Sequence, residues 1–292
     1  MNVSIGINPI TWSNDDLQNV GADISLQTCL AEASAAGFAG VELGHKFPRD
    51  PDVLRPELEQ HSLSLVSGWY SGRLLQRDSD DEIVAMQSHM KLLKAMGSDV
   101  LIFAEVTGCI HSDNRMRLSQ RPRIPVDQWP VFCRRLDEVA KACAAEGLKL
   151  CFHHHMGTVV QSREDIEIMM QSTSSEMHLL LDSGHAQFAG ADPVEIANRY
   201  AERIAHVHCK DIRVAVLQRM QNKDSSFLQA VLSGVFTVPG DGCIDYDGIF
   251  NALRKQDYSG WVVVEAEQDP SVAPPSRFAR LGFDNLSRMT SP

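Results

Sequence analysis

The sequence predicts an α/β protein built as a single (β/α)8 TIM barrel, and three observations support this prediction. Short apolar strands alternate with amphipathic helical segments eight times along the 292 residues. The strands are nearly continuous apolar runs, which is typical of a parallel sheet covered by helices. The glycine-rich dinucleotide-binding motif of an open, doubly wound sheet is missing, because Gly6-Ile7-Asn8 in the first strand begins no GxGxxG. We therefore expect a closed barrel that forms one catalytic domain over residues 1–292.

The eight strands are expected, in chain order, at Val3–Asn8, Gly40–Leu43, Leu63–Trp69, Val100–Glu105, Leu148–His155, His178–Asp182, Ile204–His208 and Trp261–Glu265. The clearest helical patterns lie between and after them, at Leu26–Ala36, Asp80–Met96, Val126–Glu146, Arg163–Gln171, Pro193–Arg203, Asp245–Gln256 and Pro275–Ser287. Gly37, Gly97, Gly147 and Gly260 follow helical patterns. We expect each of these glycines to end its helix as a left-handed C-cap.

Two connections are much longer than the others. Thr107–Pro125 follows the fourth strand and is rich in arginine, and Lys210–Tyr246 follows the seventh strand. A short helix is expected in the second connection, around Ser225–Leu232. Long loops inside a compact domain are more often functional than idle, and barrel active sites lie where such loops leave the strands.

Composition and charge exclude several classes of protein. The net charge of −11 argues against a nucleic-acid partner, which needs a basic surface to replace phosphate counterions. The N-terminus does not resemble a signal peptide, and the longest apolar runs are far too short to cross a membrane. Seven scattered cysteines without a CxxC pair exclude a disulfide scaffold and favour a cytoplasmic location. The nucleophile elbow of serine hydrolases and the P-loop are missing too.

Side chains that can bind a metal stand at the carboxyl ends of several strands. Asp182, His208 and Glu265 each end a strand, and in a barrel they would converge on its axis. The fifth strand should supply a fourth ligand, either His153 or His155, because residues two apart share one face of a strand. Imidazole and carboxylate ligands without thiolates suit a divalent ion such as Mn²⁺, Co²⁺, Mg²⁺ or Zn²⁺, with Mn²⁺ and Co²⁺ favoured.

Several segments resemble a known family. They are residues 6–15 (GINPITWSND), 40–44 (GVELG), 46–49 (KFPR), 66–72 (VSGWYSG), 152–158 (FHHHMGT), 181–185 (LDSGH), 206–211 (HVHCKD), 238–242 (VPGDG) and 245–246 (DY). With them the chain resembles the xylose-isomerase-like superfamily of metal-dependent barrels, and within it the inosose dehydratases. The resemblance extends from about residue 3 to beyond Glu265. One departure is that His153 stands where many relatives place a glutamate ligand.

The resemblance implies the dehydration of scyllo-inosose (2-keto-myo-inositol), a small polyhydroxylated cyclic ketone, in myo-inositol catabolism. The reaction removes a proton next to the ketone and expels a β-hydroxyl, so it needs a base and an acid. Four residues near the strand ends are candidates to transfer protons or to bind the developing oxyanion: Glu42, Lys46, His185 and Lys210. Four others are candidates to contact the substrate ring: Asn8, Trp12, Trp69 and Tyr70. The resemblance further implies support of activity by glutathione, and a homo-oligomer.

Three other functions fit parts of the pattern. A sugar isomerase or epimerase would use the same metal and the same enediolate, but would return the proton to carbon instead of expelling hydroxide. A barrel nuclease with three zinc ions would need a basic groove, which the charge of −11 disfavours. A carbohydrate-binding protein without catalytic activity would not need so many metal-type ligands at the strand ends.

Overall fold

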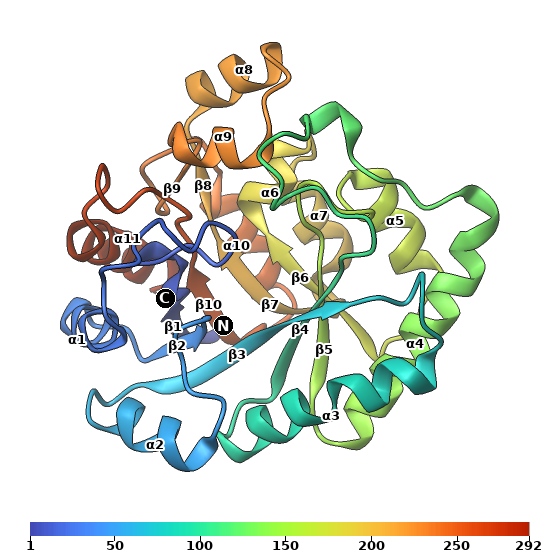
Figure 1. The fold of residues 1–292 in the computed structure, drawn as a ribbon, viewed down its shortest axis with the longest axis horizontal. Coiled ribbons are helices and arrows are strands. Elements are labelled where there is room, and N and C mark those ends of the chain that lie inside the picture. Colours follow the sequence, from blue (N-terminus) through green and yellow to red (C-terminus); the bar gives the residue numbers. More distant parts are fainter. Residues whose placement is uncertain (292) are drawn as a thin grey trace.

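The computed structural model describes residues 1–291 and contains a closed barrel of eight parallel strands, which confirms the predicted fold class. The strands are β1 (Asn2–Ile7), β2 (Gly40–Leu43), β3 (Ser64–Gly72), β4 (Val100–Glu105), β5 (Lys149–His153), β6 (Met177–Asp182), β7 (Ile204–Cys209) and β10 (Ser259–Val264). The barrel closes where β1 pairs with β10 in parallel, from Asn2 opposite Ser259 to Ile7 opposite Val264. Figure 1 shows the strands at the centre of the molecule with helices around them.

The helices around the barrel are α1 (Leu26–Ala36), α2 (Pro51–Glu59), α3 (Ser79–Ala95), α4 (Trp129–Ala145), α5 (Arg163–Gln171), α6 (Ser183–Phe188), α7 (Pro193–Tyr200), α10 (Tyr246–Arg254) and α11 (Pro275–Thr290). Short 3₁₀ helices lie at Pro9–Thr11, Leu118–Gln120, Val126–Gln128 and Ala201–Arg203. All seven expected helices are present, within a few residues of the predicted bounds.

The sequence patterns missed α2 and α6 for different reasons. Pro56 lies inside α2 and weakens its helical signature. α6 begins directly after β6, where the side chain of Asp182 caps it by accepting from the backbone N–H of His185 at 2.7 Å.

Three of the four predicted helix-ending glycines have the expected left-handed backbone: Gly37, Gly97 and Gly147. The prediction for Gly260 was wrong. This residue lies inside β10, well after the end of α10.

The connection after β7 folds into a small unit beside the carboxyl end of the barrel, here called the cap (residues 210–245). It contains α8 (Val214–Asn222), α9 (Phe227–Leu232) and an antiparallel pair of β8 (Asp211–Ile212) and β9 (Phe236–Thr237). α9 matches the short helix expected in this connection, and α8 and α9 stand outside the ring of strands and helices in Figure 1. The cap has an apolar cluster of its own, formed with Met156 and Phe188: Ile212, Leu217, Met220, Phe227, Leu228, Ala230, Val231, Val235 and Phe236.

One carboxylate ties the two ends of the cap together. Asp211, the first residue of β8, accepts hydrogen bonds from four backbone N–H groups, at Ile212, Gly240, Gly242 and Ile244. These bonds hold the loop that leads out of the cap against its point of entry, so both ends of the cap start from one place on the barrel rim.

Residues along the strands alternate between the inside of the barrel and the layer under the helices. Ile102 and Cys151 pack inside the barrel with Val100 and Leu180, whereas Phe103 and Phe152 pack in the outer layer. This alternation follows from the two-residue repeat of a strand. Among residues 1–291, no helix combines the length and the apolar character needed to cross a membrane.

A substitution at Gly72, at the end of β3, tests the packing of the layer between strands and helices. A Cβ atom at this position would lie 1.9 Å from Cζ of Phe103. We expect Gly72→Ala to lower the free energy of unfolding by roughly 1–3 kcal/mol, because Phe103 has to leave its packed position. Denaturant unfolding measures this loss. When Phe103 is first replaced by Leu, the Gly72→Ala substitution should cost clearly less stability. If the free-energy losses of Gly72→Ala and Phe103→Leu simply add, within about 0.5 kcal/mol, in the double variant, that result would contradict the proposed clash.

Candidate active site

A cavity of about 270 Å³ opens at the carboxyl ends of the barrel strands. Its lining residues are Asn8, Ile10, Asp15, Asp16, Glu42, Leu43, Trp69, Ser71, Ile102, His111, His153, His155, His208, Glu265 and Glu267. Five of these side chains are carboxylates and four are imidazoles, and within the described chain the lining includes neither lysine nor arginine. The cavity therefore suits a cation together with a neutral ligand.

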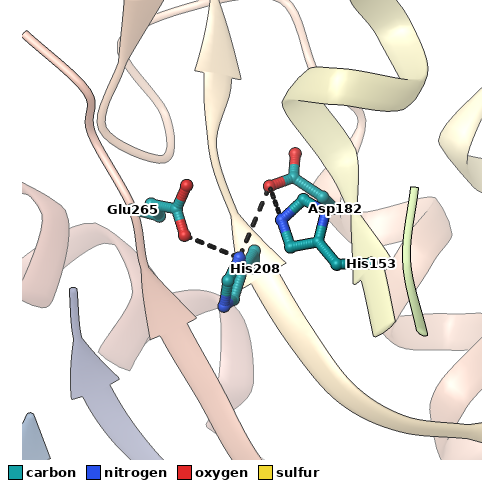
Figure 2. A group of neighbouring side chains, drawn as sticks. All are labelled: His153, Asp182, His208 and Glu265. Carbon is teal, nitrogen blue, oxygen red and sulfur yellow. Dashed lines mark ion pairs between the residues drawn. The ribbon is translucent and has the colours of Figure 1, made fainter. Parts of the chain in front are cut away.

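Four side chains converge at the floor of the cavity, as Figure 2 shows. Three of them, His153, His208 and Glu265, line the cavity, and Asp182 lies buried directly behind them. His153 ends β5, Asp182 ends β6, His208 lies near the end of β7 and Glu265 follows β10. One ligand atom from each lies within 4.8 Å of the other three. The Oδ2 atom of Asp182 is 3.6 Å from Nε2 of His153 and 3.5 Å from Nδ1 of His208, which is itself 2.6 Å from Oε2 of Glu265.

The hydrogen bonds of the two imidazoles turn their lone pairs toward this centre. His153 uses Nδ1 to donate to the carbonyl of His154 at 2.9 Å, which leaves Nε2 as the nitrogen that faces Asp182. His208 uses Nε2 to donate to Oε1 of Glu42 at 3.1 Å, which leaves Nδ1 as the nitrogen that faces Asp182 and Glu265. An acceptor behind each ring is the usual support of a histidine that binds a metal.

Two atoms at the centre are buried without a hydrogen-bond partner among the described residues: Oδ2 of Asp182 and Nδ1 of His208. The other oxygen of Asp182 caps α6, so each oxygen of this carboxylate has a separate position and role. Two imidazole and two carboxylate donors, with unpartnered atoms pointing inward, fit a divalent cation. The four residues that could hold it are His153, Asp182, His208 and Glu265.

Glu42 lies beneath the four donors and supports them. It is 2 % exposed, and its two oxygens accept hydrogen bonds from Asn8, Ser67, His206 and His208. Burial opposes its ionisation, but His208 and His206 hold the pKa of Glu42 well below its usual range. Asn8 also donates to Glu265 at 3.2 Å, so it links Glu42 to one of the four donors.

Lys210 and His185 are fully buried behind the cavity and do not line it. The ammonium of Lys210 lies 2.5 Å from Oε1 of Glu265 and 2.9 Å from Nε2 of His185. Burial disfavours the charged ammonium, yet Glu265 and Asp182 raise the pKa of Lys210 above its usual value. Lys210 is therefore a buried positive charge that balances the carboxylates of the centre.

Trp69 and His155 form a wall of the cavity beside His153. The ring of Trp69 meets the rings of His153 and His155 edge-on, with centroids 5.4 and 5.7 Å away. His155 donates from Nδ1 to the carbonyl of Met156 at 2.8 Å and stacks on His185, with centroids 3.9 Å apart. His155 is thus not one of the four converging donors, although it shares a face of the chain with His153.

The other sequence-predicted residues lie away from the cavity. The indole of Trp12 donates to Glu32, the ammonium of Lys46 donates to backbone carbonyls of residues 21–24, and the hydroxyl of Tyr70 donates to Glu82. These three side chains are engaged in holding loops and helices, and the structure does not bring them to the four donors.

Four titratable cavity residues were not among the candidate site residues predicted from the sequence: Asp15, Asp16, His111 and Glu267. Asp16 lies in the loop after β1, His111 in the long loop after β4, and Glu267 two residues beyond Glu265. Burial raises the pKa of Glu267 to about 7. The length of the loop after β4 was a signal for function, but it does not point to one residue in the loop.

Comparisons with known proteins agree with this fold. The family model "xylose isomerase-like TIM barrel" matches residues 30–287. The chain is 45 % identical to the rhizopine catabolism protein MocC of Rhizobium meliloti, over all of this chain and 90 % of that protein. It is 39 % identical to an inosose dehydratase of Geobacillus thermodenitrificans, over 95 % of this chain and 94 % of that enzyme.

Solved structures show the same fold at lower identity. The IOLI protein, solved with a binding zinc atom, superposes with a TM-score of 0.65 at 17 % identity, over 99 % of this chain and 96 % of that protein. The protein is thus a barrel with a candidate metal site at the carboxyl ends of its strands. The chain belongs to the xylose isomerase-like TIM barrel family, and its relatives in that family include the inosose dehydratases.

The two histidines of the fifth strand segment give a direct test of the metal ligands. We expect His153→Ala to weaken Co²⁺ binding by about 100-fold or more, because loss of a supporting residue alone typically costs 10–100-fold. His155→Ala should bind Co²⁺ within a few-fold of the unaltered protein. Titration calorimetry and the visible spectrum of bound Co²⁺ measure both variants, and the reverse order of affinities would contradict the assignment of His153.

Proposed function

We propose that the chain is a metal-dependent hydro-lyase that removes water from scyllo-inosose to give 3D-(3,5/4)-trihydroxycyclohexane-1,2-dione in myo-inositol catabolism. The observation that carries this proposal is the group of four buried donors on the floor of the cavity, in a chain 39 % identical to an inosose dehydratase over nearly its full length. The cavity lining supports a neutral polyol as ligand, because its polar side chains are carboxylates, imidazoles, an amide and a hydroxyl.

The residues of the site have three roles in the proposed reaction: some hold the metal, some support those donors, and one contacts the substrate ring. His153, Asp182, His208 and Glu265 hold a divalent cation, which when bound supplies Lewis acidity for negative charge that develops on substrate oxygens. Glu42 and Asn8 keep the donors oriented, and Lys210 and His185 support the centre from behind, without reaching the substrate. Trp69 offers its ring to the C–H face of the cyclic substrate.

The finer features of the proposal follow from the ligand set and from the family resemblance. Two imidazoles and two carboxylates suit a divalent ion such as Mn²⁺, Co²⁺, Mg²⁺ or Zn²⁺. Among these we propose Mn²⁺ or Co²⁺. All seven cysteines are free, which supports a reducing, cytoplasmic location. We further propose that residues 1–292 form one catalytic domain and that the protein is a homo-oligomer. Its partner is a small polyol ketone, and it binds neither nucleic acid nor a membrane. Glutathione supports its activity.

A second candidate is a role in the breakdown of rhizopine, which the 45 % identity to MocC favours. Assays of scyllo-inosose and of rhizopine side by side, with the same purified protein, separate the two candidates. The preferred substrate should have the higher kcat/KM.

The reaction type has a simple spectroscopic test. Incubation with scyllo-inosose and Mn²⁺ should produce the ultraviolet absorbance of the conjugated dione, with one water lost per turnover by mass spectrometry. A product of unchanged mass would identify an isomerase or epimerase instead and would contradict the proposed elimination of water.

Asp182→Asn tests the metal requirement with little risk to the fold. An asparagine keeps the oxygen that caps α6 but loses the charge at the centre. We expect kcat to fall by about 100-fold or more, with an unchanged melting temperature in the absence of metal. Exhaustive chelation should abolish activity in the unaltered protein, and Mn²⁺ or Co²⁺ should restore it. Activity that survives chelation would argue against the metal.

A further inference from the structure

His111 is held firmly at the edge of the cavity by the loop after β5. The backbone N–H of Ile110 donates to the carbonyl of Gly157 at 2.9 Å. Gly157 has a φ of +78°, and a Cβ atom there would lie 2.9 Å from the backbone nitrogen of His111. The two loops therefore approach as closely as a glycine permits, and the position of His111 is fixed by the backbone.

The imidazole of His111 is buried but makes no hydrogen bond with the rest of the described chain. It is 8 % exposed and lines the same cavity as the four donors. Its Nδ1 atom has no partner within residues 1–291, and its Nε2 atom is 3.6 Å from Oδ1 of Asp16, beyond hydrogen-bond distance. Buried polar groups in proteins are nearly always paired, so an imidazole without a partner in a cavity is a mark of function.

Asp16 faces His111 from the loop after β1. Burial lowers the pKa of His111 and raises that of Asp16, although each opposes the shift of the other. The imidazole is therefore held in its neutral form, which can accept a proton, beside a carboxyl group that can stabilise the imidazolium once it forms.

The other carboxylates of the cavity rim already have partners. Glu267 accepts from the side chain of Asn14 at 2.9 Å and lies 3.8 Å from the ammonium of Lys210. Asp15 is hydrogen-bonded to the ring and the backbone of His45. Among the described residues of the cavity rim, His111 and Asp16 are thus a pair of proton acceptors whose side chains make no hydrogen bond with the protein itself.

We propose that His111 is the catalytic base and acid of the dehydration, with Asp16 as the carboxylate that stabilises its protonated form. Nε2 takes the proton from the carbon next to the ketone, so a C–H bond breaks and an N–H bond forms. The same proton then passes to the β-hydroxyl as its C–O bond breaks, and water leaves. The imidazole returns to its neutral form, so no other proton donor or acceptor is needed. This role rests on the proposed dehydratase activity.

The experiment compares His111→Gln with His61→Gln, a matched change at a half-buried histidine outside the cavity. For His111→Gln we expect kcat for loss of water from scyllo-inosose to fall by about 10²–10⁴-fold, the usual effect of losing a general acid–base group. KM and the affinity for Co²⁺ should stay within about threefold of the values of the unaltered protein. The melting temperature should stay within a few degrees. His61→Gln should behave like the unaltered protein throughout.

The possible results separate this role from the proposed function. Activity of His111→Gln within about threefold of the unaltered protein would overturn the role of His111, and so would a loss of activity that matches a loss of Co²⁺ affinity. Asp16→Asn should lose less activity than His111→Gln, and full activity would overturn the pairing. An unaltered protein that binds Co²⁺ but releases no water from scyllo-inosose would contradict the proposed function, and this role with it.

Discussion

Closure of the barrel between β1 and β10 is the constraint on which the site depends. Parallel strands place all their carboxyl ends on one rim, and β10, β7, β6 and β5 are neighbours there, so the four donors lie side by side. Closure brings the first two strands round to them, so that Asn8 reaches Glu265 and Glu42 reaches His208. The four donors come from four different strands, so no local segment can form the site alone. Asp182 connects this geometry to local structure, because one oxygen caps α6 while the other points to the centre.

Sequence patterns predicted the barrel well because strands and helices leave different repeats in the chain, and a strand's last residue falls on the rim. Asp182, His208 and Glu265 could be placed together for that reason. His153 and His155 stayed equivalent in sequence, since both have the same spacing along the strand, and only the turn after β5 distinguishes them. The position of His111 could not be predicted in this way, because a residue in a long loop follows no strand or helix repeat.

The same reasoning explains why several polar strand-end residues support the four donors, whether they line the cavity, as Glu42 does, or lie behind it, as His185 and Lys210 do. Glu42, His185 and Lys210 have the residue types of catalytic groups, and sequence alone gives no depth along the barrel axis. The structure adds this depth: Glu42 lies under His208, and Lys210 lies behind Glu265. A site with two buried carboxylate ligands needs such partners, because each unpaired buried charge is costly.

The cap has an apolar cluster distinct from that of the barrel and joins the long loop after β4 by a few hydrogen bonds, among them Ser119 to Asp224 and Leu118 to Ser225. Its two ends meet at Asp211 on the barrel rim. In evolutionary terms this is a modular arrangement. The cap can change in length and composition while the strand ends that carry the four donors stay as they are, so this side of the barrel rim can diversify without rebuilding the candidate metal site.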